Sequence, residues 1–155
     1  MRFLVQRVNE ADVSVDGQCI GRIGQGFLVL VGISSADVEG GASEKIADKM
    51  VKKLIGLRIF SDEDGKTNLD LKSVQGQLLI ISQFTLYADC RKGNRPSFVN
   101  AAAPDAANNL YQYIIEKCRQ EIPIVECGSF GAHMKVSLVN DGPFTVMLDS
   151  DEVCR

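Results

Sequence analysis

The chain has 155 residues, of which 45% are hydrophobic and 24% charged, and these values predict one globular domain over residues 1–155. Its formal net charge of −3 argues against a protein that coats long nucleic acids, because such a protein needs a broad basic face. A protein that touches only the end of an RNA is not excluded. The sequence has no apolar run long enough for a membrane span, and its N-terminus is unlike a signal peptide. We therefore expect a cytoplasmic protein.

The inventory of cysteine and histidine argues against metal and imidazole chemistry. The five cysteines lack the spacing of a zinc site, and His133 is the only histidine. We therefore expect free thiols, no metal and no cofactor. Hydrolases of the Ser-His-Asp or Cys-His type are largely excluded as well, since they need an imidazole beside the nucleophile. His133 is interpreted as an exposed or hydrogen-bonded side chain.

The first part of the chain predicts strands. Residues 4–15 alternate between apolar and polar, with an interruption at 9–12, and Asp16-Gly17 indicates a turn. The glycine-rich segment 21–26 leads into a strand rather than a helix, so we interpret it as a hairpin turn. The apolar run 27–33 is typical of a strand that is buried on both faces.

The middle of the chain predicts a helix and then more strands. Apolar residues at helical spacing predict a helix that ends near Ile55, with Ser43 as its cap. A strand at 57–60 and a polar loop follow. Residues 77–87 are then expected to form one long central strand, and residues 90–97 a basic loop.

The last part predicts a second helix and three strands. The helix begins near Pro104, a favoured first-turn residue, carries an apolar stripe and is closed by Pro123. Three strand-like segments follow, and the last few residues are expected to form a flexible tail. This order predicts an α+β fold: a curved, mainly antiparallel, barrel-like sheet with two helices packed on it.

Two segments carry unusual residues for their places. Ser82-Gln83-Phe84-Thr85-Leu86 puts polar side chains at the end of an apolar strand, where each needs a hydrogen-bond partner or costs about 1–3 kcal/mol. Asn140-Asp141-Gly142-Pro143-Phe144-Thr145 is typical of a turn between two strands. Its Gly-Pro bond is a candidate for the cis form, which would re-aim two backbone carbonyls.

At these two segments the sequence resembles the D-aminoacyl-tRNA deacylase family. The resemblance covers nearly the whole chain and includes MRFLVQRV, GFLVLVGI, SQFTLYAD, KGNRPSF and SFGAHMKVSLVNDGPFTVMLDS. Phe144 stands where the family usually has Val, and His133 where it commonly has an acidic or amide residue.

The resemblance implies a homodimer with active sites at the subunit interface. Each site would combine the SQFTL strand of one chain with Gly142-Pro143, joined by a cis bond, from the other. It also implies a substrate, the acceptor end of tRNA charged with a D-amino acid, and glycine mischarged on a non-cognate tRNA as a second substrate.

On this resemblance the catalytic residues are Ser82, Gln83, Phe84 and Thr85. Backbone N–H groups around Phe84 and Thr85 would stabilise the oxyanion of the ester. Thr85 lacks a nearby base, so we expect it to orient substrate or water while the tRNA 2′-hydroxyl assists, although a nucleophilic Thr85 stays open.

The expected substrate-binding residues are Gly142, Pro143, Arg7, Phe130 and Met134. The two carbonyls of Gly142 and Pro143 would hold the α-ammonium group and exclude an L side chain. Arg7 would brace this segment, unless it is a surface arginine. Phe130 and Met134 would wall the terminal adenine, unless they only pack the core.

The basic loop supplies the expected tRNA contacts. Arg91, Lys92 and Arg95 directly follow the catalytic strand and are expected to contact phosphates of the acceptor end, which makes binding sensitive to salt. Two rivals stay open: a nucleic-acid-binding or scaffolding protein without turnover, and an esterase acting on small acyl esters.

Overall fold

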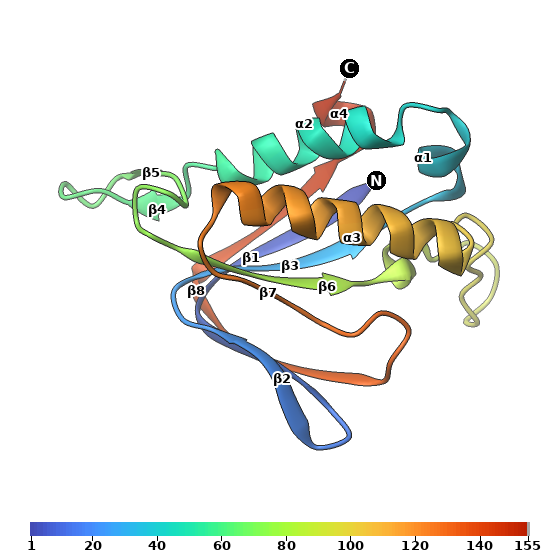
Figure 1. Cartoon of the computed structure of the whole chain (residues 1–155), viewed down its shortest axis with the longest axis horizontal. Helices are drawn as coiled ribbons and strands as arrows, with labels where there is room; N and C mark the ends of the chain where they lie inside the picture. Colours follow the sequence, from blue (N-terminus) through green and yellow to red (C-terminus); the bar gives the residue numbers. More distant parts are fainter. Residues whose placement is uncertain (155) are drawn as a thin grey trace.

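In the computed structural model, which describes residues 1–154, two helices lie side by side over one face of a strongly curved sheet (Figure 1). These are α2 (Ser43–Ile55) and α3 (Pro104–Glu121). The main sheet comprises β1 (Arg2–Val15), β2 (Gln18–Ile23), β3 (Gly26–Gly32), β6 (Gln77–Ser82), β7 (Val125–Cys127) and β8 (Met134–Asp149). Shorter elements are α1 (Ser35–Glu39), α4 (Ser150–Val153), the 3₁₀ helix η1 (Phe84–Tyr87) and the small sheet of β4 (Phe60–Ser61) and β5 (Thr67–Leu69).

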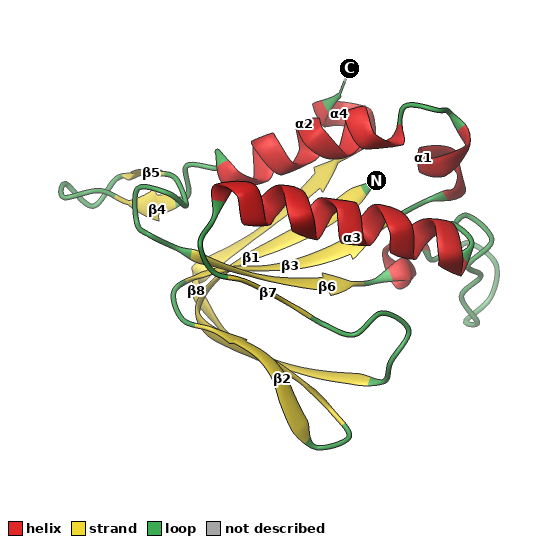
Figure 2. Ribbon diagram, in the orientation of Figure 1, coloured by secondary structure: helices red, strands yellow, loops and turns green. Residues whose placement is uncertain are grey.

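The sheet is mainly antiparallel, as predicted. Its strand order is β2-β1-β3-β6-β7, and β8 pairs with β1 along nearly its whole length. Only the β3–β6 and β6–β7 pairs are parallel. Because the first half of β1 already pairs with β3, β8 lies along the other side of β1 and forms an edge of the sheet (Figure 2). The predicted α+β class is confirmed.

Two apolar cores hold the curved sheet. The larger lies between the helices and one face of the sheet, where α3 contributes the predicted stripe of Ala107, Leu110, Tyr111, Ile114, Ile115 and Cys118. The smaller fills the inside of the curl and is formed by Val8, Ala11, Val13, Ile23, Leu28, Leu79 and Ile81. Burying each Val, Leu or Ile side chain in these cores stabilises the fold by about 1.5–3 kcal/mol. Side chains of β3 and β6 reach both cores, which explains their continuously apolar sequences.

Several predicted boundaries are wrong by a few residues. Strand β1 runs unbroken through the expected interruption, which is a bulge that leaves Asn9 without a partner between Val8 and Glu10. Ser43 is the first residue of α2 and not its cap, since Ala42 holds the cap position. The predicted strand at 57–60 is reduced to Phe60–Ser61, which pairs with a strand inside the expected polar loop.

The expected hairpin turn in the glycine-rich segment 21–26 is wrong. Strands β2 and β3 both pair antiparallel with β1, β2 with its second half and β3 with its first half. The two strands therefore run in the same direction, and the residues between them form a short break rather than a reversal. The chain reverses earlier, at Asp16-Gly17, where both residues have positive φ and the predicted turn is confirmed.

The predicted central strand at 77–87 ends at Ser82. The chain then turns into η1, where Leu86 packs so closely on Gly32 that a Cβ at that glycine would lie 2.9 Å from the Leu86 Cβ. The end of β3 therefore accepts η1 only because residue 32 has no side chain. The residues after Ser82 have side chains that favour strands, which is why a strand was predicted up to residue 87. Packing against the neighbouring strand β3 overrides that local preference.

The expected turn at 140–145 is also wrong. These residues lie inside β8, where Asn140 pairs with Val8 and Thr145 with Gln6, so residues 141–144 bulge outward opposite Arg7. A proline is tolerated at a bulge of an edge strand, because its missing N–H interrupts no ladder. All peptide bonds in residues 1–154 are trans, so the prediction of a cis bond before Pro143 is wrong. The trans form is the intrinsically favoured isomer, and Gly142 makes the bend with a φ of +93° instead.

The two ends of the described chain lie close together. The Met1 backbone carbonyl accepts a hydrogen bond from Ser150 N at 2.8 Å, at the start of α4, and this helix continues into the segment expected to be a flexible tail. Arg155, also part of that expected tail, lies outside the described residues. Within residues 1–154, no helix combines the length and the hydropathy needed to cross a bilayer.

Candidate active site

The segment Ser82–Thr85 lies where β6 passes into η1. Phe84 and Thr85 are exposed, whereas Ser82 and Gln83 are half-buried. The Gln83 side-chain amide donates a hydrogen bond to the Thr85 hydroxyl, which fixes the direction of that oxygen. The first N–H groups of a helix have no acceptor inside it, so the backbone at the start of η1 presents donors at the end of the strand. A carbonyl oxygen that gains negative charge can bind there.

An apolar cavity of about 580 Å³ opens beside this segment. Ser82, Gln83 and Phe84 line it, together with Phe130 and Met134, so the structure brings these five predicted residues together. Met134 packs on Gly128, where a Cβ would lie 2.5 Å from its sulfur, and Phe130 lies 6.0 Å from Tyr111 between ring centroids. The cavity has the size and the apolar lining of a small-ligand site.

Arg7 and the bulge of β8 form a separate cluster. Arg7 is only 7% exposed, so it is not a surface arginine. Its Nε donates to the Asp141 backbone oxygen at 3.1 Å and lies 3.2 Å from the Asp141 carboxylate, and its guanidinium stacks on the Phe144 ring at 4.3 Å. A Cβ on Gly142 would lie 2.2 Å from the Arg7 Nη2. Arg7 therefore braces the Gly142-Pro143 segment.

Within one chain this cluster lies far from the cavity. Ser82 is level with Val31 and thus with Phe3, while the bulge lies opposite Arg7, four residues further along β1. Four residues of strand span roughly 13 Å, and β8 lies three strands away from β6 at about 4.8 Å per strand. The two motif segments are therefore roughly 20 Å apart in one chain.

The basic loop lies beside the cavity rather than along the sheet. Residues 90–99 are all exposed and lie next to the start of α3 (Figure 1). Asp89 and Ser97 exchange two backbone hydrogen bonds, of 2.7 and 2.9 Å, that close the base of this loop. Arg91 binds the Asp89 carboxylate with Nε and Nη2 at 2.9 and 2.7 Å, which lowers the pKa of Asp89 to about 2. Lys92 and Arg95 make no ion pair within residues 1–154.

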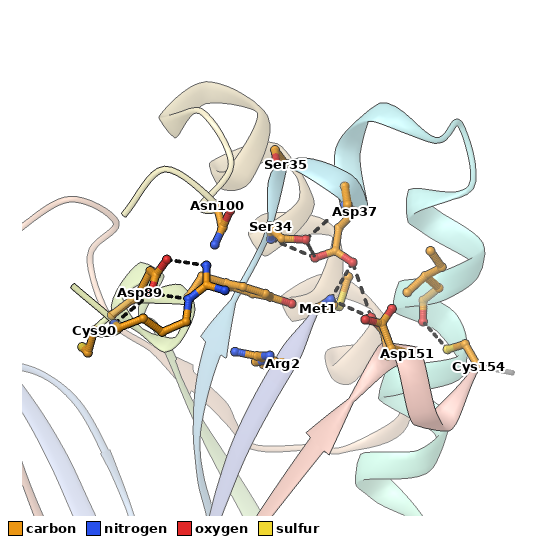
Figure 3. Close-up of a pocket in the computed structure, with 16 residues that line it drawn as sticks. Met1, Arg2, Ser34, Ser35, Asp37, Asp89, Cys90, Asn100, Asp151 and Cys154 are labelled. Atoms are coloured by element: carbon orange, nitrogen blue, oxygen red, sulfur yellow. Dashed lines mark hydrogen bonds and ion pairs between the residues drawn. The ribbon is translucent and has the colours of Figure 1, made fainter. Parts of the chain in front are cut away.

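A second cleft lies on the other side of η1, near the chain ends (Figure 3). Several of its charged groups pair with one another. The Met1 amino group lies 2.5 Å from Asp37, whose other carboxylate oxygen accepts from the Ser34 backbone and hydroxyl at 2.8 and 2.7 Å. Arg2 pairs with Asp149 at 2.9 Å. These contacts anchor α1 and the start of β1, and we assign them a structural role.

The remaining reactive side chains form no second centre. All five cysteines are free thiols, and burial raises the pKa of Cys118 to about 12, which keeps it protonated. His133 is exposed, as predicted. Within residues 1–154, no three His, Cys, Asp or Glu side chains are arranged to hold a metal ion.

Sequence patterns alone missed part of the cavity. Phe98, Ala101, Ala102 and Pro104 also line it, from the end of the basic loop and the start of α3. Nothing in their spacing links them to the strand that ends at Ser82. The one available signal was an aromatic residue directly after a basic loop, which is a common composition at nucleic-acid sites.

The sequence matches known proteins along nearly its whole length. The family model described as D-Tyr-tRNA(Tyr) deacylase matches residues 4–149. A protein of Thermosipho melanesiensis named D-aminoacyl-tRNA deacylase is 52% identical over 154 residues, which cover 99% of each chain. A protein of the same name from Clostridium novyi is 55% identical over 150 residues, which cover 97% of each chain.

Solved structures share the fold. One, of a protein named c-Myc DNA Unwinding Element Binding Protein, superimposes with a TM-score of 0.87 at 39% identity, over 96% of this chain and 98% of that one. Another, of a probable eukaryotic D-amino acid tRNA deacylase, gives a TM-score of 0.80 at 20% identity, over 95% and 97% of the two chains. The second likeness concerns the fold alone.

Proposed function

This chain belongs to the D-aminoacyl-tRNA deacylase family, and from that premise we propose that it hydrolyses the ester bond between a D-amino acid and the 3′ end of tRNA. The products are the free D-amino acid and tRNA. Glycine carried by a non-cognate tRNA is a second proposed substrate, because it has no side chain that a chiral filter could reject.

The observation that carries this proposal is that Ser82, Gln83 and Phe84 line an apolar cavity, with Thr85 next in the chain and held by Gln83. Phe130 and Met134 line the cavity, and the flat terminal adenine packs against them in the proposed complex. The ester carbonyl then lies beside the start of η1, where backbone N–H groups stabilise the oxyanion. Such donors are each worth about 2.7–4 kcal/mol in enzymes that use them.

Thr85 acts by position in this mechanism. Its hydroxyl is held by Gln83, which is not a base, so nothing on the same segment removes its proton. We assign Thr85 the orientation of substrate or water, and the tRNA 2′-hydroxyl the assistance of the attack. A trapped acyl-enzyme on Thr85 would instead establish it as the nucleophile.

Selection of the D form requires a second surface beside the bound amino acid, and we assign that surface to a partner subunit. In one chain, Gly142-Pro143 is roughly 20 Å from Ser82, as the strand register gives. A two-fold homodimer brings the bulge of one chain over the cavity mouth of the other, and each dimer then has two equivalent sites. The Gly142-Pro143 segment, with its trans bond and the bend at Gly142, is held by Arg7. We assign its backbone the contact with the amino group and the exclusion of an L side chain.

The tRNA end is held by the basic loop. Lys92 and Arg95 are exposed and are the proposed partners of acceptor-end phosphates. Arg91 already forms an ion pair with Asp89. We propose a cytoplasmic location, because the proposed substrate is made in the cytosol.

The test of the reaction is release of amino acid from D-Tyr-tRNA and L-Tyr-tRNA, compared side by side with the same purified protein. Fast release from the D form alone is the expected result. Equal release from both would refute the Gly142-Pro143 filter, and equal activity on D-aminoacyl methyl esters would favour a small-ester hydrolase. No release from either would return the chain to the nucleic-acid-binding alternative, which the name of one structural relative favours.

Subunit complementation tests the shared site. Thr85→Val and Gly142→Ala are each expected to inactivate a homodimer. In a mixed dimer, one of the two sites combines an intact Thr85 with an intact Gly142 from the other chain. Random exchange makes half of the dimers mixed, so about a quarter of wild-type activity should return. Sites built within single chains would give no recovery.

A further inference from the structure

We propose that Phe98 is a stacking platform for the base of the penultimate nucleotide of the bound RNA, and that it positions the single-stranded 3′ end as it leaves the apolar cavity. This inference rests on the proposed function, because it takes the occupant of the cavity to be the terminal nucleotide of a charged tRNA. It adds a binding residue to the same site.

Phe98 is poorly explained by folding alone. It is 36% exposed, its neighbour Val99 is 79% exposed, and Phe84, whose ring it contacts, is 54% exposed. Phe98 and Phe84 form an exposed apolar patch at the cavity, which is the kind of surface that binds a ligand. Phe98 and Phe84 meet edge-to-face, with ring centroids 5.0 Å apart and planes at 72°. In that arrangement the contact covers at most one face of the Phe98 ring, and the residue keeps 36% of its surface exposed for a base to contact.

The backbone around Phe98 is held on both sides. The two hydrogen bonds between Asp89 and Ser97 fix the residue before it, and the Phe98 carbonyl accepts from Ala101 N at 3.0 Å. A rigid aromatic side chain costs little conformational entropy when it binds. The platform is therefore formed before the RNA arrives.

The charge of the loop selects the occupant. Lys92 and Arg95 are exposed on the loop that ends directly before Phe98, and neither has a carboxylate partner within residues 1–154. Cations next to an exposed aromatic ring are the combination that binds single-stranded nucleic acid, the cations on phosphates and the ring on a base. A purely apolar partner at Phe98 would form no ion pair with Lys92 or Arg95.

The binding test uses a short uncharged RNA hairpin with a single-stranded 3′ end and 2-aminopurine at the penultimate position, because stacking quenches 2-aminopurine fluorescence. Wild-type protein should quench it. Phe98→Leu keeps apolar contact with Phe84 but has no ring, and it should abolish quenching and weaken binding roughly 5- to 150-fold, the range for loss of one stacked base. Phe98→Trp should restore both. Quenching that survives in Phe98→Leu, or wild-type protein that does not quench, would overturn the proposal.

A kinetic test separates stacking from a role in the cavity. D-aminoacyl-adenosine has the terminal nucleoside but no penultimate base, so Phe98→Leu should raise KM for charged tRNA by a larger factor than it raises KM for D-aminoacyl-adenosine. An equal loss on both substrates would show that Phe98 only shapes the cavity, and the platform would be refuted. If the wild-type protein hydrolyses neither substrate, the proposed function fails, whereas the fluorescence test still decides the role of Phe98.

Discussion

The contact between Arg7 and Gly142 predicts a measurable coupling of stability. In Gly142→Ala, the new methyl group must occupy a site 2.2 Å from the Arg7 Nη2, at a φ of +93° that L residues rarely adopt. The backbone strain costs about 1–2 kcal/mol. Displacement of Arg7 costs about 1–2 kcal/mol more, because its hydrogen bond to the Asp141 backbone and its stacking on Phe144 are lost. We expect Gly142→Ala to lower the free energy of unfolding by about 2–4 kcal/mol.

Arg7→Ala removes the same contacts and should itself cost about 2–3 kcal/mol. In the double variant the methyl group meets no guanidinium, so only the backbone strain is added. The two effects should therefore fall short of additivity by about 1–2 kcal/mol. The assay is urea unfolding at one protein concentration, with the linear extrapolation applied to all four proteins.

Gly17 provides the matched control. Its φ is +78°, but a Cβ there would meet nothing within 4 Å. Gly17→Ala should thus show strain alone, and it should be additive with Arg7→Ala. Strict additivity of Gly142→Ala with Arg7→Ala would refute the bracing role of Arg7. Non-additivity of the Gly17 pair would show that the coupling is not specific to this contact.

Three further predictions follow from single contacts. Tyr111→Phe removes the 2.7 Å hydrogen bond from the Tyr111 hydroxyl to the Ile80 carbonyl and should cost about 1 kcal/mol, seen in calorimetry as a Tm lower by roughly 2–4 °C, with deacylation unchanged. A larger loss would mean that the Gly128 N–H, which also binds that carbonyl, does not compensate. Burial raises the pKa of Cys118 from 9.0 to about 12, so between these values the unfolded thiol is ionised while the folded thiol keeps its proton. Stability should therefore fall as pH rises above 9, by at most about 1.4 kcal/mol per pH unit from this group, and urea unfolding at pH 8, 9 and 10 should give a shallower dependence in Cys118→Ala. Lys92→Ala with Arg95→Ala should make the salt dependence of RNA binding shallower by about 1.4 in log K per log salt, two phosphates at about 0.7 each, and an unchanged slope would remove both residues from the RNA contact.

The sequence predicted best where one physical signal acts alone. The stripe of α3 follows from spacing, and the proline at its start from the missing N–H, and both are found. The apolar run of β3 was correctly taken as a strand buried on both faces. The turn at Asp16-Gly17 was correctly predicted too, because these residue types tolerate the positive φ that a tight reversal needs.

Sequence reasoning failed where a distant partner decides the local structure. Residues 84–87 have the composition of a strand, but close packing of Leu86 on Gly32 makes them a 3₁₀ helix. The segment at 141–144 has the composition of a turn, but pairing with β1 on both sides makes it a bulge. Phe98 joins the cavity through a loop closure between Asp89 and Ser97, and no local pattern predicts such a contact. Each error thus has a tertiary cause.

The position of Pro143 has a consequence for solubility. Strand β8 is an edge of 16 residues with one neighbour in the described chain, and it exposes Val139 and Met147 at 47% and 46%. A long, regular edge of this kind is a template on which another chain can add a strand and begin to aggregate. Pro143 removes a donor from the middle of that edge, and the bulge around it breaks the regular spacing of its hydrogen-bonding groups. The residue that bounds the proposed site therefore also protects the protein from uncontrolled strand addition.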